Sequence, residues 1–242
     1  MGSIDHPQLQ RMKRLVVLLS LFLLAATEKQ DLLGKMFTFP VESNRHHVSL
    51  SPQLEKETNF TCITVCLRAF SDLSRRQILF SLALPTSDNA FVIYKPKREV
   101  YRLHLGESFV DFWGMQDELN VWNSVCATWD GKTGLSQLWV NGNPSTRKGF
   151  SRLGSFFGTP KIILGQDQDS YGGGFDINQS FVGMLTDVHM WNSVLSPSEI
   201  SQYMHDYWYP PGNVLNWDSL EFSKIGYVIT ESVKTTQKFN IV

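Results

Sequence analysis

The sequence predicts an all-β sandwich or barrel with a single short helix near residues 197–205. Short apolar stretches recur along the chain with turn-forming residues between them, which is typical of strands joined by tight turns. No alternation of strand and helix patterns is present, which disfavours a parallel sheet with crossover helices. The dipeptide Asn141-Gly142 follows one apolar stretch and accepts the positive φ angles of a two-residue hairpin.

The expected elements follow one another from residue 36 to residue 205. In the stretch 62–67, apolar residues alternate with smaller ones, which is the two-residue period of a strand. A turn at 85–89 contains Asp88 and Asn89. Ser196-Pro197-Ser198-Glu199 is a capping box with proline at the first helical position. Strands are expected at 36–40, 48–50, 62–67, 78–82, 91–94, 101–105, 121–129, 135–140, 162–164 and 181–183.

The composition is that of a packed globular domain without an electrostatic bias. The chain has 242 residues, 42% hydrophobic and 12% aromatic, so it can bury a large core. Its formal net charge of −1 provides no basic field for nucleic acid or an anionic membrane. No linker or repeat interrupts the pattern, so one domain is expected over residues 28–242, with a loose tail from about residue 231.

The N-terminus has the pattern of a secretory signal peptide. The apolar stretch 15–26 follows Arg11, Lys13 and Arg14 and is shorter than a bilayer requires. A buried helix or membrane anchor is the alternative. We expect residues 1–27 to be a signal peptide, with Met1 or Met12 as the start, and the mature protein to be secreted.

One stretch, residues 165–180, concentrates oxygen-bearing side chains. It holds three carboxylates, four side-chain amides and a glycine triplet between two apolar stretches. Calcium takes six to eight oxygen ligands, and glycines let a loop turn back so that both its limbs face one point. Two interpretations remain open from these residues alone, a calcium loop and a solvated hairpin loop.

If the protein is secreted, its cysteines can form disulfides and its asparagine acceptor patterns can be glycosylated. The three cysteines are Cys62, Cys66 and Cys126, and disulfides persist outside the cell. Asn59 begins an Asn-Phe-Thr acceptor pattern at the expected start of a strand. Asn178 begins a second such pattern inside the oxygen-rich loop, where a glycan would crowd a metal, so modification is expected at Asn59 only.

A series of motifs occurs in order along the chain, at 64–67, 88–89, 164–173 (Leu-Gly-Gln-Asp-Gln-Asp-Ser-Tyr-Gly-Gly), 181–183, 190–191, 194–197, 213–217 and 226–229. Through these motifs the chain resembles the pentraxins from about residue 35 to residue 229. Two features depart from the family pattern. The family's His-x-Cys-x-Ser/Thr-Trp-x-Ser/Thr signature has Ser124 in place of its histidine and Gly131 in place of its last hydroxyl residue. Asp167 and Asp176 stand where family members often carry glutamate. Because aspartate has the shorter side chain, it could weaken the binding of one of the ions.

The resemblance implies a two-sheet antiparallel jelly-roll sandwich that binds two calcium ions per subunit on one face. Four carboxylates brought together without a cation would repel one another, and two Ca²⁺ ions would offset that charge. Carried over residue by residue, the calcium ligands are Asp88, Asn89, Asp167, Gln168 through its backbone carbonyl, Asp169, Asp176 and Gln179.

The resemblance also implies a disulfide and a ligand pocket. The family's disulfide corresponds to Cys66 and Cys126 in this chain. Three possibilities remain for Cys62: a buried free thiol, a disulfide to another molecule, or a disulfide to Cys126 in place of Cys66. Tyr94 falls where the family places an aromatic wall, and His104 and Glu107 lie nearby in the pattern, although each also fits an ordinary strand residue.

The function that the resemblance implies is that of a secreted, calcium-dependent pattern-recognition lectin in innate immunity. Its expected ligands are phosphocholine, phosphoethanolamine or acidic sugar headgroups. Its expected partners are complement or phagocyte receptors and further copies of itself in a ring, usually five-fold. A laminin-G-like adhesion domain is one alternative. An enzyme such as a glycoside hydrolase is disfavoured, because no catalytic carboxylate, serine or zinc motif is found in the sequence.

Overall fold

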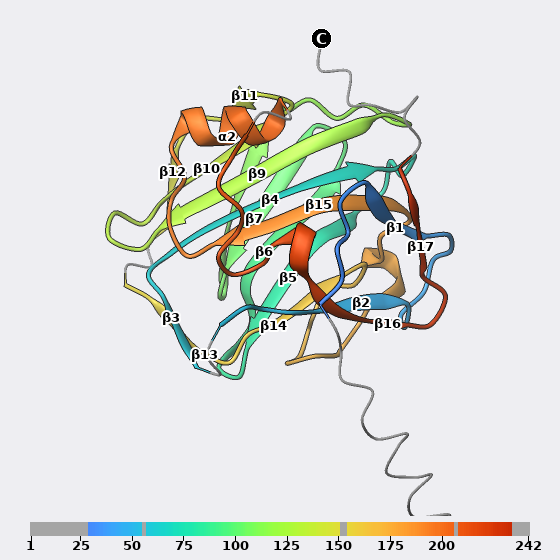
Figure 1. Cartoon of the computed structure of the whole chain (residues 1–242). Coiled ribbons are helices and arrows are strands. Elements are labelled where there is room, and N and C mark those ends of the chain that lie inside the picture. The colour runs from blue at the N-terminus through green and yellow to red at the C-terminus, as the bar shows by residue number, and fades with distance from the viewer. Residues whose placement is uncertain (1–28, 55–56, 151–153, 206–207, 234–242) are drawn as a thin grey trace, which may run out of the picture.

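The computed structural model describes residues 29–54, 57–150, 154–205 and 208–233, which form two large antiparallel sheets packed face to face (Figure 1). The chain crosses repeatedly between the sheets, for β1, β4 and β15 lie in one and β2, β5 and β14 in the other. The predicted all-β class and the jelly-roll sandwich are thereby confirmed. The expected signal peptide at residues 1–27 lies outside the described residues.

The spatial order of the strands differs from their order along the chain. The first sheet contains, in spatial order, β11 (Asn143–Pro144), β10 (Leu135–Val140), β9 (Trp122–Asp130), β4 (Cys62–Phe70), β15 (Gly183–Trp191), β1 (Lys35–Phe39) and β17 (Ile229–Ser232), with β12 (Lys148–Gly149) also paired to β10. The second contains β16 (Glu221–Ile225), β2 (His47–Ser51), β14 (Lys161–Leu164), β5 (Gln77–Leu84), β6 (Ser87–Lys97), β7 (Val100–Leu105) and β8 (Ser108–Trp113). A small third sheet pairs β13 (Phe156–Gly158) with β3 (Thr58–Phe60).

The core lies between the two large sheets and is rich in aromatic side chains. Alternate residues of each strand point into it, as the two-residue period requires. Phe37 meets Trp217 and Phe222 edge-on, with ring centroids 5.2 and 4.8 Å apart. Phe39 meets Phe181 in the same way at 5.7 Å. Such edge-to-face pairs favour one packing arrangement over many similar ones, because their geometry is specific.

The single α-helix among the described residues is α2 (Pro197–Met204), and it covers the outer face of the first sheet (Figure 1). Ser196 accepts the amide hydrogen of Glu199, and the Glu199 carboxylate accepts that of Ser196, so the predicted capping box is confirmed. Ile200 and Tyr203 pack on Trp139 and on the disulfide. This cover explains why β4 is buried on both of its faces.

Cys66 and Cys126 form a disulfide between neighbouring strands, as the resemblance implied. The two residues stand directly opposite each other in the register of β4 and β9. Cys62 begins β4, opposite Asp130, and its thiol is free and partly buried. Its Sγ lies 3.7 Å from a carboxylate oxygen of Asp130.

The local sequence predicted the backbone correctly at one turn, residues 141–142, and incorrectly at another, residues 88–89. Asn141 and Gly142 have φ angles of 50° and 84°, as expected for the predicted two-residue hairpin between β10 and β11. By contrast, the prediction of Asp88 and Asn89 in a turn is wrong. Strand β6 begins at Ser87, so both residues are already in the second sheet.

The first and last strands of the described chain, β1 and β17, pair with each other at one edge of the first sheet. Strand β17 pairs with β1 as far as Ser232, slightly beyond the point where the sequence predicts a loose tail. Strands β8, β12, β13, β16 and β17 were not predicted, and the strand predicted at 181–183 begins only at Gly183. Among the described residues, no helix has the length and apolar character that crossing a membrane requires.

Candidate calcium-binding site

The candidate site lies where the loop between β14 and β15 covers strand β5. Gln168 anchors this loop, because its amide nitrogen donates to the carbonyls of Ser81 and Lys161 at 3.2 and 3.1 Å. Its amide oxygen accepts the backbone N–H of Gly172 at 3.0 Å. The side chain of Gln168 therefore holds the loop, and its predicted role as a cation ligand concerns its backbone carbonyl alone.

A glycine at the start of the loop is needed for close packing. Gly165 has a φ of 90°, and a Cβ added there would lie 2.4 Å from a ring carbon of Phe39. Gly174, the last of the glycine triplet, has a φ of 76° and would place a Cβ 2.9 Å from the carbonyl carbon of Asp169. The two limbs of the loop thus approach each other more closely than other residues would allow.

The four predicted carboxylate ligands interact electrostatically. Burial, together with the negative charges of Asp169 and Asp88, raises the pKa of Asp167 to about 7. Burial also raises the pKa of Asp169, with Asp88 and Asp176 adding to the effect. Asp88, near the start of β6, is therefore close to loop residues that lie about eighty positions later in the chain. Like charges gathered in this way are stabilised by a bound cation.

Two buried oxygen atoms at this site accept no hydrogen bond from any residue that the structure describes. They are Oδ1 of Asp167 and Oε1 of Gln179. The same two side chains meet through a hydrogen bond of 3.3 Å from Nε2 of Gln179 to Oδ2 of Asp167. A buried oxygen without a donor costs free energy, and a hard cation satisfies such atoms. The donor chemistry of these residues therefore fits calcium.

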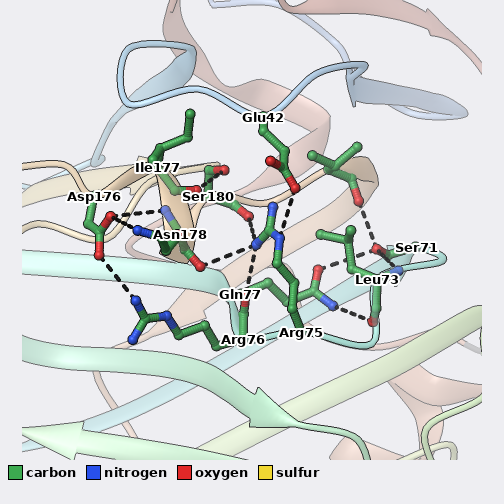
Figure 2. Close-up of polar contacts among 11 residues, drawn as sticks. Glu42, Ser71, Leu73, Arg75, Arg76, Gln77, Asp176, Ile177, Asn178 and Ser180 are labelled. Carbon is green, nitrogen blue, oxygen red and sulfur yellow. Dashed lines mark hydrogen bonds and ion pairs between the residues drawn. The ribbon is translucent and has the colours of Figure 1, made fainter.

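Asp176 is held by its own neighbours. It caps the short 3₁₀ helix η1 (Ile177–Gln179) by accepting from the backbone and side-chain nitrogens of Asn178 at 3.0 and 2.8 Å (Figure 2). These bonds and the guanidinium of Arg76, 3.4 Å away, lower its pKa. Within the described part of the chain, no three His, Cys, Asp or Glu side chains converge as a metal cage does. Asp176 is nevertheless close enough to Asp169 for its charge to raise the pKa of that carboxyl.

Arg75 clamps the second limb of the loop, a role that the sequence analysis missed. One nitrogen, Nη1, donates to the backbone carbonyls of Asn178 and Ser180 at 3.3 and 2.9 Å, and Nε pairs with Glu42 at 2.9 Å (Figure 2). The contacted carbonyls flank Gln179. No local pattern reveals this role, because Arg75 lies about a hundred residues before the loop.

We expect the substitution Arg75→Gln to lower calcium affinity roughly 10- to 100-fold, the range observed when residues that orient metal ligands are removed. Glutamine cannot reach both carbonyls, so Gln179 loses its support. Isothermal titration with CaCl₂ measures the change. Glu42→Gln is the matched control, because it removes an exposed ion pair, worth little, and keeps the carbonyl contacts. Equal affinities for Arg75→Gln and wild type would contradict this role.

The residues predicted to line a ligand pocket lie on neighbouring strands of the second sheet, Tyr94 on β6 and His104 on β7. Tyr94 and His104 meet edge-on at 6.4 Å between ring centroids, but Tyr94 is only 7% exposed. Burial lowers the pKa of His104 to about 4, and the nearby charge of Arg102 contributes. Glu107 is exposed in the turn between β7 and β8, next to Gly106, whose N–H donates to the carbonyl of Asn89 at 2.8 Å.

The two glycosylation patterns differ in their surroundings. Asn59 is exposed on β3, in the small third sheet. Asn178 uses its side-chain nitrogen to bind Asp176 inside the loop. A glycan on Asn178 would break that bond, which agrees with the expectation that Asn59 is the modified residue.

Comparisons with known proteins agree with the fold. The sequence profile of the Pentaxin family matches residues 35–232. Serum amyloid P-component of Sus scrofa is 41% identical over 221 residues, which cover 90% of this chain and 97% of that protein. The Homo sapiens protein of the same name is 43% identical over 211 residues, covering 86% and 91%. A heptameric SAP-like pentraxin from Limulus polyphemus superposes with a TM-score of 0.76 at 24% identity, over 84% of this chain and 96% of that one.

The fold and these relatives define a class of protein, a non-enzymatic β-sandwich lectin of the pattern-recognition type. Within that class, the chain belongs to the pentaxin (pentraxin) family. The resemblance stated from the sequence motifs is thereby confirmed.

Proposed function

We propose that the chain is a secreted lectin that binds its ligands through two calcium ions. The ions would be held by Asp88, Asn89, Asp167, the backbone carbonyl of Gln168, Asp169, Asp176 and Gln179. The observation that carries this proposal is the pair of donor-less buried oxygens on Asp167 and Gln179 beside electrostatically coupled carboxylates. When bound, calcium supplies a positive charge to which an anionic ligand coordinates.

The ligands we propose are phosphate or carboxylate headgroups, such as phosphocholine, phosphoethanolamine and acidic sugars. Tyr94, His104 and Glu107 would form the side of the pocket that faces the remainder of the ligand. Because single sites of this kind bind weakly, avidity from a ring of subunits would raise the affinity for a surface. A ring is supported by the heptameric SAP-like relative, and the five-fold form expected from the sequence remains a proposal.

The biological setting belongs to the same proposal. Residues 1–27 would be removed as a signal peptide, residues 28–242 would form one domain, and Asn59 would carry a glycan. Complement or phagocyte receptors are the proposed partners for a ligand-loaded ring. Serum amyloid P-component relatives, which are secreted, support the extracellular location.

Calcium removal tests the proposed function. The protein is passed over phosphoethanolamine and phosphocholine matrices in 2-(N-morpholino)ethanesulfonate or similar phosphate-free buffer with CaCl₂, and then with chelator. We expect retention on at least one matrix in calcium and complete release by chelator. An uncoupled matrix is the control for non-specific adsorption. Retention that survives chelation would refute a calcium-bridged mechanism.

A further inference from the structure

An arginine already occupies the aromatic surface beside the candidate site. Arg102 of β7 lies over the ring of Phe109 of β8, with 3.7 Å between its Cζ and the ring centroid. Nε and Nη2 of Arg102 bind the two carboxylate oxygens of Asp111 at 2.7 and 3.0 Å. Phe109 is half exposed, so the guanidinium covers an aromatic face that solvent or a ligand would otherwise reach.

The register of the strands places this pair next to the calcium residues. Tyr94, Arg102 and Asp111 stand opposite one another on β6, β7 and β8, and His104 stands opposite Phe109 in the row nearer the start of β6. The proposed ligands Asp88 and Asn89 are the second and third residues of strand β6. Leu103 and Phe112, which alternate with these residues, lie in the core. The row of Arg102 therefore faces outward beside the site.

The acid that pairs with Arg102 is already engaged, which favours an anionic ligand over a cationic one. Asp111 is already bound on both oxygens by Arg102, so this acid is not free to pair with an ammonium group. Nη1 of Arg102 is not committed to Asp111 and remains a donor for an anionic oxygen.

We propose that Arg102 is a specificity-determining residue, because it fills the aromatic face that a quaternary ammonium would need. This inference rests on the proposed calcium-dependent function and narrows its ligand class. The site then takes phosphate monoesters and acidic sugars without a cationic tail in preference to phosphocholine. A choline group has to displace a guanidinium that is stacked on Phe109 and doubly bound to Asp111.

The test compares methyl phosphate with phosphocholine by titration calorimetry in calcium. Wild type is expected to bind methyl phosphate more tightly. Arg102→Ser exposes the face of Phe109 and frees Asp111, so the ratio of phosphocholine to methyl phosphate affinity rises roughly 3- to 30-fold, the range for cation–π contacts. Lys97→Ser is the matched control, because Lys97 lies over Trp113 one row further from the calcium residues, and the ratio stays unchanged.

A second variant separates ligand contact from a general structural effect. In Arg102→Ser/Phe109→Ala the aromatic face is gone and only the freed Asp111 remains, so the ratio falls below that of Arg102→Ser, while circular dichroism verifies the fold of each variant. The inference is overturned if wild type prefers phosphocholine, or if both ligands bind in calcium and Arg102→Ser leaves their ratio unchanged. If neither ligand binds to wild type in calcium, the proposed function fails and this inference fails with it.

Discussion

Replacing Asp167 by asparagine is expected to lower calcium affinity roughly 100-fold or more, because loss of a direct ligand costs more than the 10- to 100-fold seen for residues that only orient ligands. Asp167 is 5% exposed and is the most strongly perturbed carboxylate of the candidate site. Asparagine keeps the shape and removes the charge. Calcium titration followed by calorimetry measures the loss, and thermal unfolding with and without CaCl₂ gives an independent readout.

The same substitution has a second expected effect that a simple folding defect cannot imitate. Without calcium, the buried charge of Asp167 lies near Asp169 and Asp88 and costs free energy, so its removal should leave the calcium-free protein as stable as wild type or more stable. With calcium, the increase in Tm that the ion produces should shrink. Asp218→Asn, at an exposed position in the helix η2 (Trp217–Ser219), is the control and should preserve the calcium response. An unchanged calcium affinity for Asp167→Asn would remove Asp167 from the ligand set.

Removing the disulfide is expected to lower the free energy of unfolding by about 4 kcal/mol, since the bond between Cys66 and Cys126 closes a loop with a sequence separation of 60 residues. For a chain of this size, that corresponds to a decrease in Tm of roughly 8 to 16 °C. The double variant Cys66→Ala/Cys126→Ala avoids leaving an unpaired buried thiol. Guanidinium unfolding of this variant and wild type, under identical calcium, measures the difference.

Cys62→Ala is the control that also decides the pairing. Cys62 lies four residues from Cys66 on the same strand, about 13 Å along β4, so it cannot bond to Cys126 in the observed register. We expect this variant to differ from wild type by less than about 1 kcal/mol, because only a partly buried thiol changes. A loss as large as that of the double variant would show that Cys62, and not Cys66, is the bonded partner.

Much of the fold was predictable because its signals are local. The capping box at Ser196 and Glu199 satisfies donors within one helical turn, and the structure contains it. The hairpin at Asn141 needs only residues that accept positive φ. The oxygen-rich loop was recognisable for the same reason, since its acids, amides and glycines are contiguous in sequence. Burial on both faces of β4 was not predictable, because it depends on a helix that comes much later in the chain.

The sequence by itself thus determined the all-β class, the helix and its cap, the oxygen-rich loop and, through its motifs, the family. Only the tertiary structure brought Asp88 beside Asp169, placed Arg75 on the carbonyls around Gln179, and stacked Arg102 on Phe109. The physical reason is the sequence separation between the residues that interact. Caps, turns and strand periods depend on neighbours a few residues apart, whereas these contacts depend on strand register and sheet packing, which bring together residues that no local pattern relates.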